Sequence, residues 1–185
     1  DDELRLPLER LDDGRVEPLA DRRRVGADVV LRVDRARHAV VERQVGDLRE
    51  LYRMRELLEE EAIRAALPRI DGPTLERLAR HVGDADDASA AGDLAAYAQS
   101  NRRFHLELYE ASGRPLLART IRQLWDASDA YRALYANRDS HRATAAEHHR
   151  AILDALASGD ADAAVAAQDR HRAHALAALT AILPD

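Results

Sequence analysis

Apolar residues recur at intervals of three and four over most of this chain, the spacing that places side chains on one face of an α-helix. Glycine, proline and aspartate interrupt the pattern where helices usually begin or end; Asp160, for example, is expected to be an N-cap. The pattern predicts six helices, over residues 47–67, 73–82, 93–112, 115–135, 143–157 and 160–182, with a loop over residues 83–92. Because the connections are short, we expect an all-α fold, a six-helix antiparallel bundle.

The first 30 residues have a different pattern. Leu4, Leu8 and Leu11 predict a short amphipathic helix that Gly14 ends, and residues 16–30 fit two short strands about a basic turn. About thirty residues cannot enclose a core of their own. We therefore expect three segments: the C-terminal part of a larger module over residues 1–30, a linker over residues 31–46, and a helical domain over residues 47–185.

The composition agrees with a helical globular protein, since 46% of the 185 residues are hydrophobic, 34% are charged and 4% are aromatic. No run approaches the ~20 apolar residues that a bilayer requires, and no signal segment indicates export, so we expect a cytoplasmic protein. The chain has no cysteine, which leaves histidine, carboxylate and amide groups as metal ligands. Its net charge of -6 means that any contact with DNA needs a local basic patch.

The eight histidines are the unusual chemical resource of this chain. Asn101 and His105 are one helical turn apart, His149 lies on the inner face of the fifth predicted helix, and His171 lies on the sixth. Three imidazoles and one amide oxygen form a ligand set suited to Zn, Ni or Mn. Core or capping histidines would show the same spacing, so both interpretations stay open. We interpret His148 as a solvated neighbour, and His38, His81, His141 and His174 as surface residues.

Two further features could line a ligand pocket. Arg55 shares the inward face of its predicted helix with Tyr52 and Glu59, where it either receives a carboxylate in a bidentate fork or pairs with Glu59. Tyr131 and Tyr135 are four positions apart on the fourth predicted helix and either line the pocket or pack in the core.

Several motifs, in order, resemble the FCD effector domain, the C-terminal half of FadR-type GntR-family bacterial transcription regulators. Residues 51–59 (LYRMRELLE) are similar to the opening of that domain, and residues 101–105 (NRRFH) resemble its D/N-x-x-F-H motif. Residues 111–117 are similar to the loop that follows, and residues 149–156, with His171, resemble the C-terminal signature. Residues 4–30 also resemble the family's recognition helix and wing, with the first helices of a winged helix-turn-helix absent from this chain.

The resemblance implies an all-helical effector domain, a homodimer, and a divalent metal, Zn or Ni in the first place and Mn otherwise. The implied ligands are Asn101, His105, His149 and His171. Asn101 stands where many members of the family have aspartate, and a neutral amide oxygen is a weaker ligand than a carboxylate.

The function implied is that of a ligand-responsive transcription regulator, a repressor that binds operator DNA and senses a small carboxylate, with no enzymatic activity. Arg55 and Tyr135 are the expected effector contacts. The expected DNA contacts are basic residues of the first segment: Arg5, Arg10, Arg22, Arg23 and Arg24. A solvated charge run is the alternative for those arginines. A metal-dependent hydrolase or lyase in a helical bundle, or a dimerising helical module without a ligand, are the alternative functions.

Overall fold

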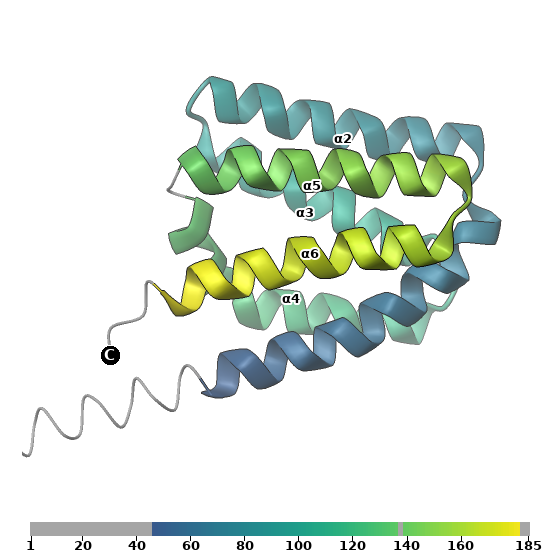
Figure 1. Cartoon of the computed structure of the whole chain (residues 1–185), viewed down its shortest axis with the longest axis horizontal. Helices are drawn as coiled ribbons and strands as arrows, with labels where there is room; N and C mark the ends of the chain where they lie inside the picture. The colour runs from purple at the N-terminus through teal and green to yellow at the C-terminus, as the bar shows by residue number, and fades with distance from the viewer. Residues whose placement is uncertain (1–45, 137–138, 182–185) are drawn as a thin grey trace, which may run out of the picture. The chain divides into compact units, whose positions relative to one another are not determined.

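The structure, a computed structural model, describes residues 46–136 and 139–181, and every regular element within those ranges is a helix (Figure 1). The first is the N-terminal helix, residues 46–66. It is followed by η1 (Leu67–Arg69), α2 (Gly72–Ala90), α3 (Leu94–Glu110), α4 (Pro115–Ala136), α5 (Asp139–Ser158) and α6 (Ala161–Thr180). The predicted all-α fold is confirmed. None of these described helices is both long enough and apolar enough to cross a bilayer.

Three aspartates fix the starts of helices through their side chains. The carboxylates of Asp71, Asp93 and Asp160 each accept a hydrogen bond of 2.9 Å from the backbone N–H three residues later. Each bond satisfies one of the N–H groups that a helix leaves unpaired at its start. The prediction that Asp160 is an N-cap is confirmed.

The predicted loop over residues 83–92 is wrong, because α2 continues to Ala90. The aspartates and Gly83 of this stretch resemble a loop, but Ala85 and Ala88 continue the inner face of α2 and are buried against Tyr97 of α3. The chain turns only at Gly92, whose φ of 72° lies in the left-handed region that favours glycine. The fifth predicted helix also begins earlier than expected, at Asp139 rather than at residue 143.

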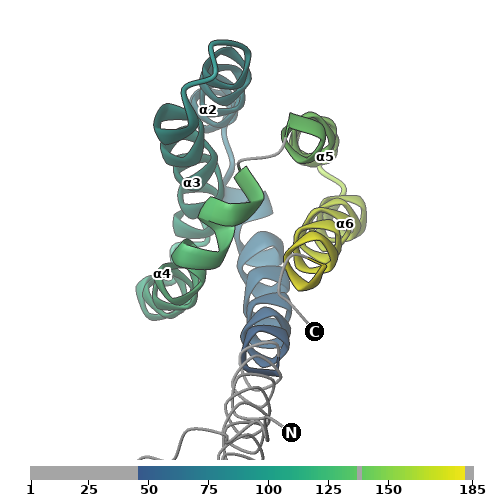
Figure 2. The same ribbon diagram turned by 90° about the vertical axis from the view of Figure 1, so that its left-hand side faces the viewer.

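The N-terminal helix runs through the middle of the domain. Figure 2 shows it between one group of helices, α2, α3 and α4, and the pair α5 and α6. Ala62, Ile63 and Ala66 from this helix lie in the largest core cluster, together with residues of every other α-helix, including Trp125 of α4 and Ile152 of α5. A side chain on the inner face of the N-terminal helix is therefore able to contact both groups of helices.

The inner face of the N-terminal helix contains two charged residues. Tyr52, Arg55 and Glu59 are buried at intervals of three and four, whereas Met54 and Leu57 are 41% and 54% exposed. Charged side chains are almost never fully buried unless they are paired. The N-terminal helix thus buries charged side chains where apolar ones would usually lie, and we treat this face as a candidate site.

Candidate metal centre and buried ion network

Three of the predicted ligands come together from three different helices. His105 of α3, His149 of α5 and His171 of α6 each offer a ring nitrogen, and these three atoms lie within 4.8 Å of one another. The Nε2 atoms of His105 and His149 are 3.2 Å apart. The ring centroid of His171 lies 4.8 Å from that of His105 and 4.6 Å from that of His149. The three residues are only 0–7% exposed.

Burial keeps the imidazoles of His149 and His171 neutral. It lowers the pKa of His149 to about 3, with smaller effects from the charges of His148 and Arg150. Burial also holds the pKa of His171 well below its ordinary value, helped by His149, His148 and Arg55. A neutral imidazole has one nitrogen with a free lone pair, the form that binds a metal ion.

An unpaired buried nitrogen is a second feature that fits a divalent metal at this place. The Nδ1 atom of His171 is buried and has no hydrogen-bond partner among the described residues. Buried polar atoms are normally paired, so such an atom needs an explanation, and an ion is one. Three imidazole nitrogens are a common ligand set for zinc with an open fourth position.

Aromatic rings enclose the three histidines. The ring of Phe104 lies 4.8 Å from that of His105 and 5.0 Å from that of His149, and Trp125 lies 4.9 Å from His105. These rings restrict the histidine rotamers and keep water away. An ion at this point would interact with its ligands in a medium of low dielectric constant.

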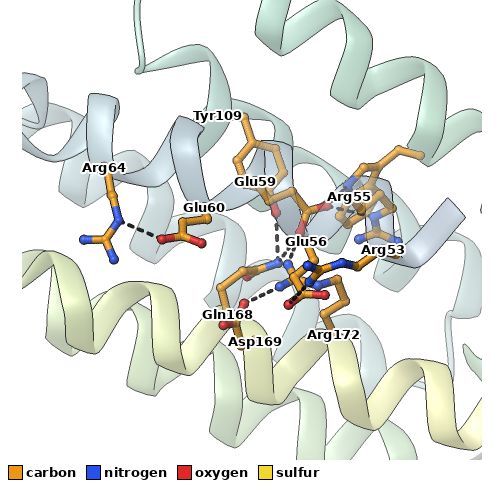
Figure 3. Close-up of polar contacts among 11 residues, drawn as sticks. Arg53, Arg55, Glu56, Glu59, Glu60, Arg64, Tyr109, Gln168, Asp169 and Arg172 are labelled. Atoms are coloured by element: carbon orange, nitrogen blue, oxygen red, sulfur yellow. Dashed lines mark hydrogen bonds and ion pairs between the residues drawn. The ribbon is translucent and has the colours of Figure 1, made fainter. Parts of the chain in front are cut away.

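Glu59 is the centre of a second buried group, the Glu59 network (Figure 3). Its Oε1 accepts hydrogen bonds from Arg55 Nε at 2.8 Å and from Trp125 Nε1 at 3.0 Å. Its Oε2 accepts from Gln168 Nε2 at 3.0 Å and from Arg172 Nη1 at 2.8 Å. One carboxylate thus joins the N-terminal helix to α4 and α6 through four donors.

The Glu59 network carries a net positive charge inside the protein. Burial alone would raise the pKa of Glu59, but the charges of Arg55 and Arg172, together with hydrogen bonds from Arg55 and Gln168, lower it. One carboxylate therefore faces two buried guanidinium groups. Arg172 also pairs with the half-exposed Asp169, whereas Arg55 has no second acid partner among the described contacts.

Arg55 keeps one donor free. Its guanidinium carbon lies 4.7 Å from the ring centroid of Tyr52 and 4.5 Å from that of Trp125, so the group is stacked between two aromatic side chains. Its Nη1 and the hydroxyl of Tyr52 are both buried without a hydrogen-bond partner among the described residues. The ring of Trp125 contacts both Arg55 and His105, so the unpaired donors lie on the side of the Glu59 network that adjoins the histidines. A small anion would satisfy them.

The other predicted site residues are less defined by the structure. Asn101 is half-buried on α3, one turn before His105, so its contact with an ion stays a prediction. The side chain of Tyr135 lies outside the described residues. The predicted DNA contacts also lie outside them: Arg5, Arg10, Arg22, Arg23 and Arg24.

Sequence analysis missed three members of the Glu59 network: Trp125, Gln168 and Arg172. A signal for Gln168 was present, because Ala164, Gln168 and His171 succeed one another at intervals of four and three on α6. A glutamine between a buried alanine and a buried histidine lies on the inner stripe and needs a polar partner there.

The histidines interpreted as surface residues are more enclosed than expected. His81 is half-buried and its Nε2 lies 2.8 Å from Glu107 Oε2, while Arg77 donates to the other oxygen of that carboxylate. Both oxygens of Glu107 are thus paired with residues of α2, so Glu107 is not available as the general base that a metal hydrolase would need. His141, His148 and His174 are also half-buried. His38 lies outside the described residues.

Comparison with known proteins identifies relatives of this domain. The model of the FCD domain family matches residues 50–174. Among solved structures, Escherichia coli McbR/YncC is 25% identical with a TM-score of 0.68, over 71% of this chain and 67% of its own. Streptococcus agalactiae GntR is 24% identical with a TM-score of 0.58, over 70% of this chain and 58% of its own.

A third relative corresponds to the helical domain alone. The metal-free FCD domain of TM0439 is 22% identical with a TM-score of 0.63, over 74% of this chain and 94% of its own. The chain thus spans about two thirds or less of the longer relatives and nearly all of the isolated domain. No curated protein matches the sequence.

Proposed function

The chain belongs to the FCD domain family, and we propose that it is a transcription regulator rather than an enzyme and that its helical domain senses a small carboxylate at a divalent metal ion. The observation that carries this proposal is the meeting of three buried imidazole nitrogens within 4.8 Å. Beside them, Arg55 holds an unpaired donor. The histidines would hold the ion, and Arg55 would hold the anion that approaches it.

The metal ligands proposed are His105, His149 and His171, with the amide oxygen of Asn101 as a fourth. Imidazole ligands suit zinc and nickel, whereas manganese prefers more oxygen ligands. When bound, the ion supplies a Lewis-acid centre that attracts a carboxylate oxygen. The buried rings of Phe104 and Trp125 would then hold the ligands in place.

The carboxylate would be recognised by the unpaired donors of Arg55 and Tyr52, with Tyr135 as a further proposed contact. Glu59 fixes the direction of the guanidinium by accepting its Nε–H, so that Nη1 is left for the effector. An anion here would also offset the excess positive charge of the Glu59 network. Charge and hydrogen bonding therefore both favour a small acid over a neutral ligand.

Effector binding would reach DNA through the N-terminal helix. Arg55 lies on this helix, which directly follows the proposed linker over residues 31–46. We propose residues 1–30 as part of a winged helix-turn-helix and residues 47–185 as the effector domain of a cytoplasmic, homodimeric repressor of operator DNA. A switch requires that the effector bind the DNA-competent and DNA-incompetent arrangements with different affinities. Sedimentation of the protein as a monomer at micromolar concentration would contradict the dimer.

Thermal unfolding tests the effector site. The metal-free chain should be stabilised by Zn²⁺ or Ni²⁺, and acetate, lactate or malate should raise the midpoint further only when metal is present. Arg55→Lys keeps a charge beside Glu59 but removes the planar fork, so it should keep the response to metal and lose the response to carboxylates. Arg53→Lys, an exposed change on the same helix, is the control. Equal carboxylate responses of both variants would refute the role of Arg55.

A further inference from the structure

Six of the eight histidines form a continuous file of ring contacts. The file begins at the start of α5, passes back and forth between α5 and α6, and ends at α3. The centroid distances are 5.5 Å for His141–His174, 5.6 Å for His174–His148, 5.9 Å for His148–His171, 4.6 Å for His171–His149 and 5.1 Å for His149–His105. The last three histidines of the file form the proposed inner metal site, and the first three, His141, His174 and His148, belong neither to that site nor to the Glu59 network.

Helix geometry explains why the outer three histidines meet. His141 and His148 are seven residues apart on α5, which is two turns, so both project from one face about 10 Å apart along the axis. His174 of α6 contacts both rings and therefore lies between them. The helices α5 and α6 run side by side and antiparallel, joined by the short turn at Gly159 (Figure 1).

Two of the three separations between the outer rings are close to that of imidazoles around one ion. A tetrahedral zinc ion lies about 2.0–2.1 Å from each ligand nitrogen, which places the centroids of two ligand rings about 5 Å apart. The inner site has separations of 4.6–5.1 Å, and the outer contacts are 5.5 and 5.6 Å. To share one ion, His141 and His148 must both turn toward His174, and their half-buried positions leave room for such rotations.

A second observation points to a ligand at the same place. The Nδ1 atom of His148 is buried and has no hydrogen-bond partner among the described residues. A solvated histidine would satisfy both nitrogens with water. His148 instead keeps one nitrogen out of solvent while its ring touches His174.

We propose that His141, His148 and His174 form a second, outer site for a divalent metal ion of the zinc, nickel or cobalt class. All three ligands are imidazoles, which excludes calcium and magnesium as preferred ions. The site binds more weakly than the inner one, since its side chains are less enclosed and lose more freedom on binding. It is distinct from the proposed carboxylate site, because none of its ligands belongs to the inner site or to the Glu59 network.

Metal titration of the untagged chain tests the outer site. Metal-free protein, prepared without a polyhistidine tag, is titrated with Zn²⁺ in competition with a chromophoric chelator. We expect two ions per chain for the wild type, and one, bound with unchanged tight affinity, for His148→Gln and for His174→Gln. His81→Gln is the matched control, since His81 is a half-buried histidine outside the file and should keep both ions.

The variants distinguish the two sites. His149→Gln should lose the tight ion and keep the weak one, and circular dichroism checks that each variant is folded. A wild type that binds two ions in a manner insensitive to His148→Gln and His174→Gln would overturn the outer site, as would a wild type with a single ion that only His149→Gln removes. A single ion that His174→Gln removes and His149→Gln leaves would support the outer site and overturn the inner one.

Discussion

Replacement of Glu59 by glutamine should destabilise the domain severely, although the two side chains have nearly the same shape. The carboxylate is fully buried and faces Arg55 and Arg172, whose side chains are 3% and 5% exposed. The amide oxygen of glutamine can still accept hydrogen bonds, but its NH₂ group would point at another donor. Two guanidinium groups would then remain in the core with no buried counter-charge.

The loss of stability can be estimated from the cost of the two unpaired guanidinium groups. Removal of one partner of a buried ion pair costs about 3–5 kcal/mol, because the remaining charge is neither solvated nor paired. A domain of this size has a free energy of unfolding of about 5–15 kcal/mol, so Glu59→Gln would remove a large share of it. The midpoint of thermal unfolding should fall by roughly 10 °C or more.

Urea unfolding measures this effect with two signals, circular dichroism and the fluorescence of the single tryptophan. Trp125 donates its Nε1–H to Glu59, so its emission reports on the same contact that is changed. Glu56→Gln is the matched control. Glu56 lies three residues before Glu59 on the same helix and pairs with Arg53, but Glu56 is 41% exposed and Arg53 is 61% exposed. An exposed pair contributes only about 0.2–1 kcal/mol. A loss for Glu59→Gln no larger than that of Glu56→Gln would refute the argument from burial.

Three further predictions concern the ligands, pH and DNA. Asn101→Asp adds a charged oxygen without a change of size and should tighten Zn²⁺ binding in a chelator competition; weaker binding would remove Asn101 from the ligand set. The metal-free chain should lose stability as pH falls from 6.5 to 4.5, by up to about 1.4 kcal/mol per pH unit for His149, because its folded pKa of about 3 lies below the unfolded value of 6.5 and the unfolded state takes up the proton. Urea unfolding in EDTA at several pH values checks this, and a flat profile would contradict it. Arg22→Ala and Arg24→Ala should weaken binding to all DNA sequences and flatten its salt dependence, while an unchanged slope would place both outside the interface.

The fold was largely predictable because local sequence decides most helix ends. Asp160 and Pro115 lie where helices begin, and Gly113 and Gly159 have positive φ after helices end. The largest difference was the end of α2, where the polar sequence suggested a loop. Burial of Ala85 and Ala88 against Tyr97 is a tertiary interaction, and it decided the conformation of a stretch with weak local preference.

The candidate site was predictable only in part. Helical spacing and family resemblance selected His105, His149 and His171, and the structure brings them together. The partners of Glu59 were harder to predict, since Gln168 lies 109 positions away in sequence and its contact depends on how α6 packs. The outer histidines were interpreted as surface residues because single-helix patterns do not show the facing helix. Contacts between helices depend on how the helices pack, and the periodicity of a sequence does not show which helices face one another.

Anomalous diffraction at the zinc edge, from crystals of the chain grown with Zn²⁺, tests the central claim most directly. The account predicts a peak enclosed by His105, His149 and His171, about 2.0–2.1 Å from one nitrogen of each ring. A weaker peak among the outer histidines would be consistent with this result and would not replace it. Density with no anomalous peak between the three inner rings, at a zinc concentration that saturates the titration, would contradict the account.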